Sequence, residues 1–512
     1  MSIWFVGWIV KGFNHGGTGI TEGVKGFTAK IAGRIKSRGE VQKSRRGAEE
    51  RTSFALFRMT NSRFGTMCRR GLAMHLQIAT CLSLLVAWAN VASAQAAQRA
   101  PIGKFNGPGG CASSSCHGSI LPKTVTRIPQ NEYSIWAGQD KHARAYQVLS
   151  NDVSVRMGKI LGLKTPPSEN QKCLACHALA VAPEQRAQSF EIDDGVSCEN
   201  CHGPASGWLG PHTVKGWEAK SAEEKDKLGM RVLTDLAVRS HTCLHCHVGT
   251  EEKWVDHQMI AAGHPDLTFE LNLFSSVMPR HWKESKETPW YGTKEWAVGQ
   301  SMQLRDSLQR LARRAQSSTW PEYAELDCFA CHHSLTAAKD SWRQESGYAG
   351  RTPGVPAWNA SRYVMFKYAA REVNAGAAGQ LESEMKKLAG LMGQLNGNRE
   401  EIAATAGRAA EMAHQLTGSL NAQTFDQAFT LRVMRAIAKD GAVISVEGQR
   451  AAEQATMSLD SLFTTYKANA GDLNGGEVRT AINELFQQVE NPSAYSAPGF
   501  AAAMGKVSGA LR

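Results

Sequence analysis

The sequence predicts a mainly α-helical protein in two parts, a loop-rich segment of short helices followed by a bundle of longer helices. Three observations lead to this prediction. Ten of the twelve cysteines lie between residues 111 and 331, in five pairs that are each followed at once by a histidine. Beyond residue 331 the sequence has no cysteine, and apolar residues recur at helical spacing instead. The Gly- and Pro-rich stretch ESGYAGRTPGVPAW at 345–358 separates the two parts.

The amino-terminal residues predict an export signal. From Met67 the chain reads MCRRGLAMHLQ, then IATCLSLLVAWANV, then ASAQ, which is a basic start, an apolar core and a small-residue cleavage site. Residues 67–94 are therefore expected to be a signal peptide that is cleaved near Ala94. A membrane-spanning helix is the alternative, but the apolar run is shorter than the roughly 18–20 residues that a bilayer crossing needs. Residues 1–66 show no globular pattern and are expected to be a non-native or untranslated extension.

Nearly all of the net positive charge of the chain lies in these amino-terminal residues. Residues 1–94 hold 14 of the 58 Lys and Arg but only 4 of the 47 Asp and Glu, so they carry +10 of the net charge of +11. After cleavage the chain would be close to neutral, which argues against a nucleic-acid partner. No later stretch is apolar enough to span a membrane. The mature protein is therefore expected to lack a transmembrane segment and to be periplasmic or extracellular.

The paired cysteines predict covalently bound haem. A c-type haem takes two thioether bonds from cysteine thiols, and the histidine after the second cysteine becomes the proximal ligand of the iron. Four pairs have this C-x-x-C-H spacing. Structural zinc, which joins C-x-x-C pairs into four-ligand sites, and a disulfide framework are the alternatives. The cysteines expected to attach haem are Cys111, Cys116, Cys173, Cys176, Cys198, Cys201, Cys243, Cys246, Cys328 and Cys331.

The first pair, CASSSCH at 111–117, has two extra residues and is also expected to attach a haem. Its histidine follows the second cysteine as in the other four motifs, and two small residues can bulge out of the loop. A free or disulfide-paired couple of cysteines is the alternative. The sequence thus predicts five haem c groups per chain. Their proximal ligands would be His117, His177, His202, His247 and His332.

Further histidines predict that imidazole also fills the sixth coordination positions. Low-spin haems need a second axial ligand, and histidine is the usual one. Eight more histidines lie in the same region, which exceeds the five positions to be filled. Methionine is the competing ligand, and Met157, Met230, Met259 and Met278 are present. The histidines expected to serve as second ligands are His142, His212, His241, His257, His264 and His281, and the sequence leaves open which haem each one serves.

The motifs resemble those of the cytochrome c-554 family. The resemblance depends on W-x-x-x-x-x-H-A-x-A at 136–145 and on CHGP followed by a histidine ten residues after the motif histidine, and it covers about residues 105–335. It implies an electron carrier with short helices wrapped around stacked haems, and His142 and His212 as second iron ligands. Members of that family often leave one haem five-coordinate. A fifth motif and a long haem-free tail depart from the family's tetrahaem pattern.

A multihaem cytochrome c domain is accordingly predicted over 95–345, and a haem-free α-helical domain over 358–512. A longer helix is expected at 294–316. In the second domain we expect an antiparallel bundle of four to six helices. One lies in TFDQAFTLRVMRAIAKDG, where Thr424 and Gln427 would form a capping box and Asp440-Gly441 would end the helix. Apolar periodicity predicts the others at 359–374, 379–395, 398–418, 447–468 and 476–489.

Electron transfer is the function that these features favour. Closely packed haems in one chain would carry electrons between redox partner proteins, whose identity the sequence does not give. One alternative is an oxidoreductase that acts on a small nitrogen or sulfur species at one open haem. The other is a structural subunit of an extracellular or membrane-associated haem assembly. The sequence contains no C-x-x-C-K motif, Walker loop or nucleophile elbow. A carrier is therefore favoured over an enzyme, and an oligomer is compatible with the sequence.

Overall fold

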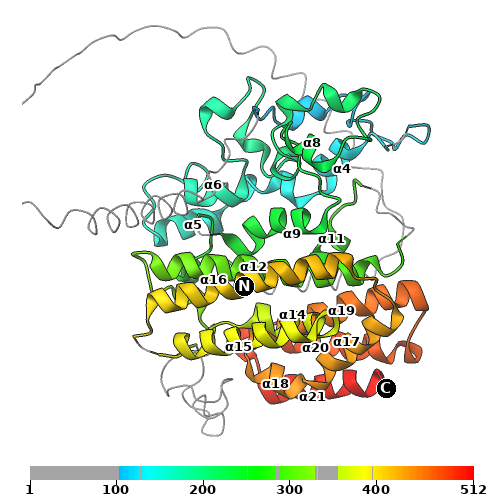
Figure 1. Ribbon diagram of the computed structural model, residues 1–512. Coiled ribbons are helices and arrows are strands. Elements are labelled where there is room, and N and C mark those ends of the chain that lie inside the picture. The colour runs from blue at the N-terminus through cyan, green and yellow to red at the C-terminus, as the bar shows by residue number, and fades with distance from the viewer. Residues whose placement is uncertain are drawn as a thin grey trace, which may run out of the picture. The chain divides into compact units, whose positions relative to one another are not determined.

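The long helix α12, Tyr291–Gln316, is the element on which the rest of the described chain is assembled. It is buried on nearly every side, and Trp296, Leu304 and Leu308 have no exposed surface. Its most extensive neighbour is α16, Arg399–Ala422, and the two helices run side by side in Figure 1. The longer helix predicted at 294–316 is thereby confirmed, and it begins three residues earlier.

The structure is a computed structural model that describes residues 103–126, 128–250, 252–282, 288–328, 331–332, 356–394 and 396–512. The predicted extension at 1–66 and the predicted signal peptide at 67–94 lie outside the described residues, as does most of the predicted linker at 345–358. All of the described residues belong to one compact unit. They contain helices, turns and two isolated β-bridges, and no strand, so the predicted mainly α class is confirmed.

The described residues that carry the cysteine motifs lie on either side of α12, at 103–282 and 317–332. They form short helices joined by long loops and 3₁₀ turns, and we call them the motif segment. Up to residue 230 its apolar side chains form small separate clusters, such as Leu149, Leu174 and Ala178, whereas those of α9 and α11 join the large core described below. This loop-rich arrangement agrees with the prediction. The short helices are α4 Glu132–Gln139, α5 Asp152–Ile160, α6 Gln171–His177, α7 Cys198–His202, α8 Ala222–Asp226, α9 Leu236–Leu244, α10 His257–Ala262 and α11 Leu271–Val277.

The residues after the motif segment form longer helices around a single large core, and we call them the C-terminal helices. Helix α19 lies at its centre, and Leu462 and Phe463 on it are fully buried. The six helices that periodicity predicted are all present, and α18 and α21 are additional. The C-terminal helices are α14 Ser361–Val373, α15 Ala375–Met392, α16, α17 Gln427–Lys439, α18 Gly441–Val446, α19 Gln449–Ala470, α20 Glu477–Val489 and α21 Ala497–Ala510.

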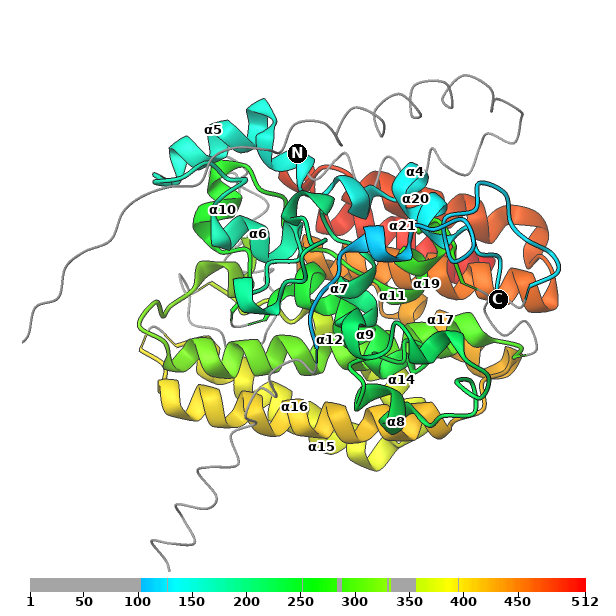
Figure 2. The same ribbon diagram turned by 90° about the horizontal axis from the view of Figure 1, so that it is seen from above.

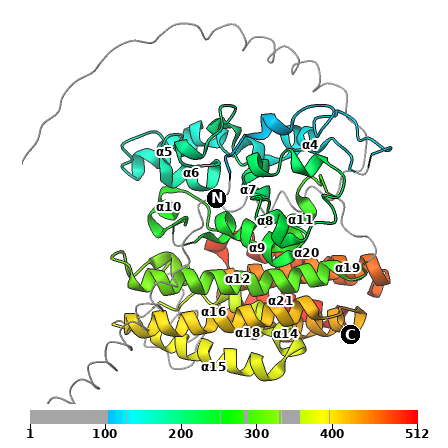
Figure 3. The ribbon, with the colours of Figure 1, turned by 45° about the horizontal axis from the view of Figure 1, so that its top comes forward.

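Helix α12 contacts the motif segment on one side and the C-terminal helices on the other. On the first side it packs against α9 and α11, and on the second against α14, α16 and α19, as Figures 2 and 3 show. Small residues allow the close approach to α16, where the Ser301 hydroxyl hydrogen-bonds the Ala413 carbonyl at 2.8 Å. A strongly packed helix therefore joins the two parts of the chain.

One local prediction is wrong. Thr424 and Gln427 do not form a capping box, because α17 begins at Gln427 and its N-cap is Asp426, whose carboxylate accepts a hydrogen bond from the Phe429 amide at 2.7 Å. Asp426 lies one residue before the helix, where a side-chain oxygen reaches the free amides of the first turn. The predicted end at Asp440 is confirmed. Among the described helices, none combines the length and apolar character that crossing a bilayer requires.

Candidate functional site: five cysteine motifs and their histidines

The five motifs, which we number along the chain, lie at helix ends or in tight turns. The second ends α6 and the third forms α7. The fourth begins in α9 and continues into a π-helical turn, His245–Gly249. Such turns wind more loosely than an α-helix and occur often at functional sites. In each case a short, locally hydrogen-bonded turn brings two cysteines and a histidine to one place.

The stretched first motif keeps the backbone link that the shorter motifs have. The His117 amide donates to the Cys111 carbonyl at 3.2 Å, as the His332 amide of the fifth motif donates to the Cys328 carbonyl at 2.8 Å. The extra residues are accommodated by a turn that bulges into solvent, where the serines at 113–115 are all exposed. The two additional residues therefore leave the relation of the histidine to the first cysteine intact.

Cysteines of different motifs lie next to one another. The thiols of Cys111 and Cys198 lie close enough for each to shift the pKa of the other, which brings the first and third motifs together. Those of Cys176 and Cys246 likewise shift each other's pKa, which brings the second and fourth motifs together. All ten motif cysteines are free thiols. Over the described ranges, no three His, Cys, Asp or Glu side chains are grouped to hold a metal ion.

Four of the five motif histidines each face a histidine from elsewhere in the motif segment. The ring centroids are 6.1 to 6.3 Å apart in all four pairs. An imidazole nitrogen bonds a transition metal at about 2.0 Å and lies about 1.1 Å from its ring centroid, so two imidazoles on opposite sides of one metal place their centroids about 6.2 Å apart. The pairs therefore fit a shared iron. They are His117 with His212, His247 with His142, His177 with His264, and His332 with His257.

Hydrogen bonds to the outer ring nitrogen, Nδ1, orient most of these rings. Metal-bound histidines typically donate this N–H to a carboxylate or carbonyl, which leaves Nε2 free for the metal. Two partners are carboxylates, with Glu132 2.9 Å from His117 and Asp140 3.0 Å from His142. The others are main-chain carbonyls. They are Ala145 for His177 at 2.9 Å, Leu209 for His212 at 2.6 Å and Pro265 for His264 at 2.7 Å.

Burial sets the protonation of the innermost rings. Burial above all lowers the pKa of His202 and of His247 to about 4. Both imidazoles are therefore neutral at neutral pH, which is the form that binds a metal ion. At His117 the hydrogen bond to Glu132 acts in the opposite direction and raises the pKa. The carboxylate thus adds negative charge at the first motif, whereas His177 of the second motif has a neutral partner, the Ala145 carbonyl.

His202 of the third motif stands apart from the other four. Within the described part of the chain, no second imidazole lies at the separation seen in the four pairs. His281 is the histidine whose charge acts most on it, after the effect of burial. The His281 ring packs against Trp282 at 5.1 Å. The structure therefore brings this predicted second ligand near the third motif but not into ring contact with His202.

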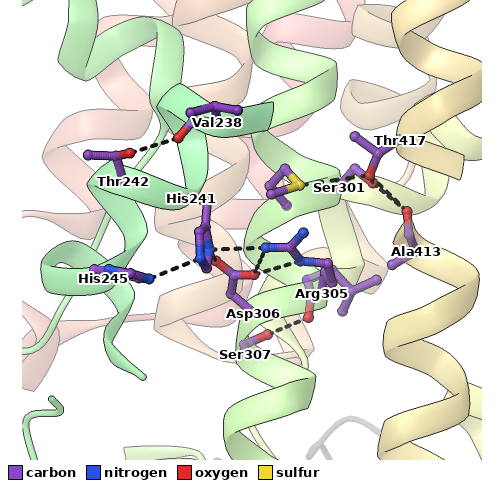
Figure 4. Close-up of polar contacts among 12 residues, drawn as sticks. Val238, His241, Thr242, His245, Ser301, Arg305, Asp306, Ser307, Ala413 and Thr417 are labelled. Atoms are coloured by element: carbon purple, nitrogen blue, oxygen red, sulfur yellow. Dashed lines mark hydrogen bonds and ion pairs between the residues drawn. The ribbon is translucent and has the colours of Figure 1, made fainter. Parts of the chain in front are cut away.

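His241 is placed differently from the other predicted second ligands. Its Nδ1 is 2.9 Å from the Asp306 carboxylate of α12, and its Nε2 is 3.0 Å from Nε2 of His245, as Figure 4 shows. Arg305 contacts both His241 and Asp306. The structure therefore pairs His241 with His245, which lies between the two cysteines of the fourth motif. It does not pair His241 with a histidine that follows the second cysteine of a motif. This cluster joins α9 to α12.

The first three motifs are what the chain shares with known proteins. Residues 111–203 match the family of cytochrome c554 and c-prime. The match begins at Cys111 and ends at Gly203, so it includes the stretched motif and the next two. The predicted resemblance is thereby confirmed over these residues, and the family implies covalently bound haem c. No curated protein and no solved structure matches the chain.

The last residue of the cytochrome c554 match shows why the third motif reads CHGP. Gly203 has a φ of 82°, a conformation that favours glycine, and a Cβ there would lie 2.2 Å from the Gly229 carbonyl oxygen. The adjacent loop runs back over the first motif and carries His212, whose ring contacts Trp208 and Trp217. A larger residue at position 203 would therefore clash with the backbone at Gly229.

Sequence reasoning missed the two carboxylates that orient histidines. Asp140 has a detectable signal, because it stands two residues before His142 and also caps the 3₁₀ turn Lys141–Arg144. An Asp in this position commonly accepts a hydrogen bond from the amide two residues on. Glu132 has no local signal, because it lies 15 residues from His117 and reaches it through the fold. Helix α4 ends at Gln139, and His142 follows it in the 3₁₀ turn.

Proposed function

We propose that this chain is an exported pentahaem c-type cytochrome that transfers electrons between redox partner proteins. The observation that carries the proposal is the set of four histidine pairs at 6.1 to 6.3 Å, each of which joins a motif histidine to one outside the motifs. Bound haem c would supply one-electron redox chemistry at each site. The match over 111–203, which starts at the stretched motif, supports counting that motif as a haem site.

The residues of the four pairs would be the axial ligands. His212 would serve the first motif, His264 the second, His142 the fourth and His257 the fifth. In each pair the two histidines come from different elements, so ligation would also tie loops of the motif segment together. The hydrogen bonds at Nδ1 hold the rings in place before any metal is bound, which lowers the cost of orienting them.

Contacts among the motifs give the five sites an order. The first and third are joined by Cys111 and Cys198, and the second and fourth by Cys176 and Cys246. The third and fourth are adjacent because α7, which forms the third motif, packs against α9, in which the fourth motif begins. Helix α10 carries His257 and is followed closely by His264, which links the second and fifth sites. In space the sites would therefore follow one another in the order of motifs one, three, four, two and five. Electrons could pass along this order from each site to a neighbouring one.

The proposal is tested on holoprotein made in a host that matures c-type cytochromes. Intact mass should show five haems and a start near residue 95. Replacing His142, His212, His257 or His264 by Ala should convert one haem of the five from low spin to high spin in the ferric optical spectrum. His414→Ala is the matched control, because that histidine is exposed on α16. Four haems, or histidine variants that all stay low spin, would contradict the assignment.

A second candidate function is the binding of a small ligand at the third motif. The observation that favours it is that His202 lacks the paired imidazole seen at the other four motifs, over the residues described. An iron with one protein ligand could bind a small nitrogen or sulfur species at its other face. Carbon monoxide added to the reduced holoprotein distinguishes the two functions. A spectral change in one haem of five supports ligand binding, and an unchanged spectrum supports a carrier alone.

A further inference from the structure

A partly enclosed cavity between the motif segment and the C-terminal helices is lined by four arginines. Its volume is about 40 Å³. Four guanidinium groups face two carboxylates around it, so the lining has two positive charges in excess. Buried charges are stable only when they are paired or hydrogen-bonded. The charged residues are Arg310 and Arg314 of α12, Arg362 of α14, Arg450 of α19, and the two acids Asp266 and Glu325.

Glu325 is already fully engaged. Arg310 binds it with two parallel contacts, Nε to Oε1 at 2.8 Å and Nη2 to Oε2 at 2.9 Å. Arg314 adds a third from Nη1 at 2.8 Å. The remaining nitrogens of Arg314, Nε and Nη2, are buried and have no hydrogen-bond partner among the described residues. The side chain of Arg314 is only 6% exposed, and its guanidinium lies 4.8 Å from the centre of the Trp254 ring.

Arg450 of α19 is the second arginine at this cavity whose guanidinium has a nitrogen without a hydrogen-bond partner among the described residues. Its Nε pairs with Asp266, and its Nη1 donates to the carbonyls of Ala324 at 3.1 Å and Leu326 at 3.2 Å. Its Nη2 is buried without a partner among the residues that the structure describes. Nearly all buried donors in folded proteins find an acceptor, so donors left over on two arginines indicate an acceptor that is not part of the protein chain.

Arg362 adds positive charge without an acidic partner of its own. Its Nη1 donates to the Gln303 side chain at 2.8 Å and its Nη2 to the Leu267 carbonyl at 2.7 Å. Both acceptors are neutral, and burial lowers the pKa of Arg362 to about 10, so the group is still charged at neutral pH. The cavity as a whole therefore suits an anion with oxygen acceptors.

The cavity lies beside two of the proposed haem sites. Among its lining residues, Val248 directly follows the motif histidine His247, and Val255 stands two residues before His257. Glu325 stands three residues before Cys328 of the fifth motif. Each haem carries two propionate groups, which are carboxylates at neutral pH. An arginine fork matches a carboxylate in shape and charge.

We propose that this cavity receives the propionate carboxylate of an attached haem, held by Arg314 and Arg450. The inference rests on the proposed haem attachment. It gives the haem-free C-terminal helices a role, because Arg450 reaches from α19 into the motif segment and would bind the cofactor directly. A free oxyanion from solution has the same chemistry and is the competing occupant.

Redox titration of the holoprotein tests the proposal. Arg314→Gln removes one positive charge and two unpaired donors, and should lower the midpoint potential of one haem while the other four stay unchanged. Arg314→Lys keeps the charge and should restore most of that potential. Arg408→Gln is the matched control, because Arg408 forms an exposed ion pair with Glu384 on the C-terminal helices. Unchanged potentials in Arg314→Gln would overturn the proposal.

Two measurements on the unaltered protein keep the test decisive if a variant does not fold. A crystal structure of the holoprotein should show propionate oxygens within hydrogen-bond distance of Arg314 or Arg450, and propionates directed elsewhere would overturn the inference. Exchanging chloride for nitrate at constant ionic strength should leave every midpoint potential unchanged, and a shift would identify a free anion as the occupant. Intact mass separates the two proposals, because a mass without haem would refute the proposed function itself.

Discussion

Replacing Glu132 by Gln should raise the reduction potential of the haem at the first motif. The Glu132 carboxylate accepts a hydrogen bond from His117 Nδ1 at 2.9 Å, and its side chain is only 15% exposed. Although burial acts to raise the pKa of Glu132, the hydrogen bond with His117 and its charge outweigh this and lower the pKa, so the group is ionised at neutral pH. A nearby negative charge stabilises the oxidised, more positive iron. Gln keeps the hydrogen-bond acceptor and removes only the charge.

The size of the effect follows from the distance between the charge and the proposed iron. Adding the width of the imidazole ring and a metal–nitrogen bond to the 2.9 Å contact places the carboxylate oxygen about 7 Å from the metal. At an effective dielectric constant of about 20, a unit charge at this distance changes the energy by about 2.4 kcal/mol. For a one-electron couple this corresponds to about 100 mV, and partial solvent screening reduces it to about 50–100 mV.

A spectroelectrochemical titration of the wild-type and Glu132→Gln holoproteins would measure this shift. One of the midpoint potentials should rise by the stated amount and the others should move little. Glu184→Gln is the control, because Glu184 is exposed in the 3₁₀ turn Pro183–Gln185 and should leave all potentials unchanged. A shift below about 20 mV would correspond to a fully water-screened charge and would refute the argument from burial. A shift of equal size in Glu184→Gln would show that the effect is not local.

Three further predictions follow from the packing, the buried acids and the ring angles. Leu462→Ala in the core of the C-terminal helices should lower the free energy of unfolding by about 2–5 kcal/mol, whereas Val443→Ala at an exposed position should change it little, as urea unfolding would show. Burial raises the pKa of Glu453 to about 7, so the unfolded chain loses this proton at a lower pH than the folded protein. Relative to Glu453→Gln, the free energy of unfolding of the wild type should therefore fall by about 3 kcal/mol as the pH rises from about 4.5 to 7. Parallel pH profiles of the two proteins would contradict this. Electron paramagnetic resonance of the ferric protein should show two classes of low-spin signal. The reason is that the ring planes are near parallel in two histidine pairs, at 12° and 29°, and near perpendicular in the other two, at 89° and 85°. A single class of signal would argue against the pairs.

Local sequence features were sufficient for most of the fold. Helix α12 and the six predicted C-terminal helices follow from apolar residues repeated at helical spacing, which is a property of neighbouring residues. Helix α21 was missed because its sequence, APGFAAAMGKVSGA, is dominated by alanine and glycine and its periodicity is weak. Its helical state depends on packing Phe500 and Met504 into the large core, where both are fully buried. Propensity alone does not determine such a segment.

The candidate site was predictable in composition but not in pairing. The motif cysteines and histidines are recognisable because attachment chemistry fixes their spacing. Which second histidine faces which motif depends on contacts between residues far apart in the chain. His142 faces His247 across more than one hundred residues, and His247 lies beyond the family match over 111–203. His241 looked equivalent to the others in sequence, and only the position of Asp306 on α12 shows why it is held elsewhere.

The six-residue helix α10 holds the proposed second ligands of two haem sites, the second and the fifth. It begins at His257, and His264 follows two residues after its last residue, so both proposed second ligands move with it. Its N-cap Asp256 forms an ion pair with Lys172, beside the second motif, and the His257 amide donates to Glu322, near the fifth. Any force that displaces this helix would release both ligands together. Loss of ligation at these two centres should therefore be concerted on heating or in denaturant, with one shared transition instead of two separate ones.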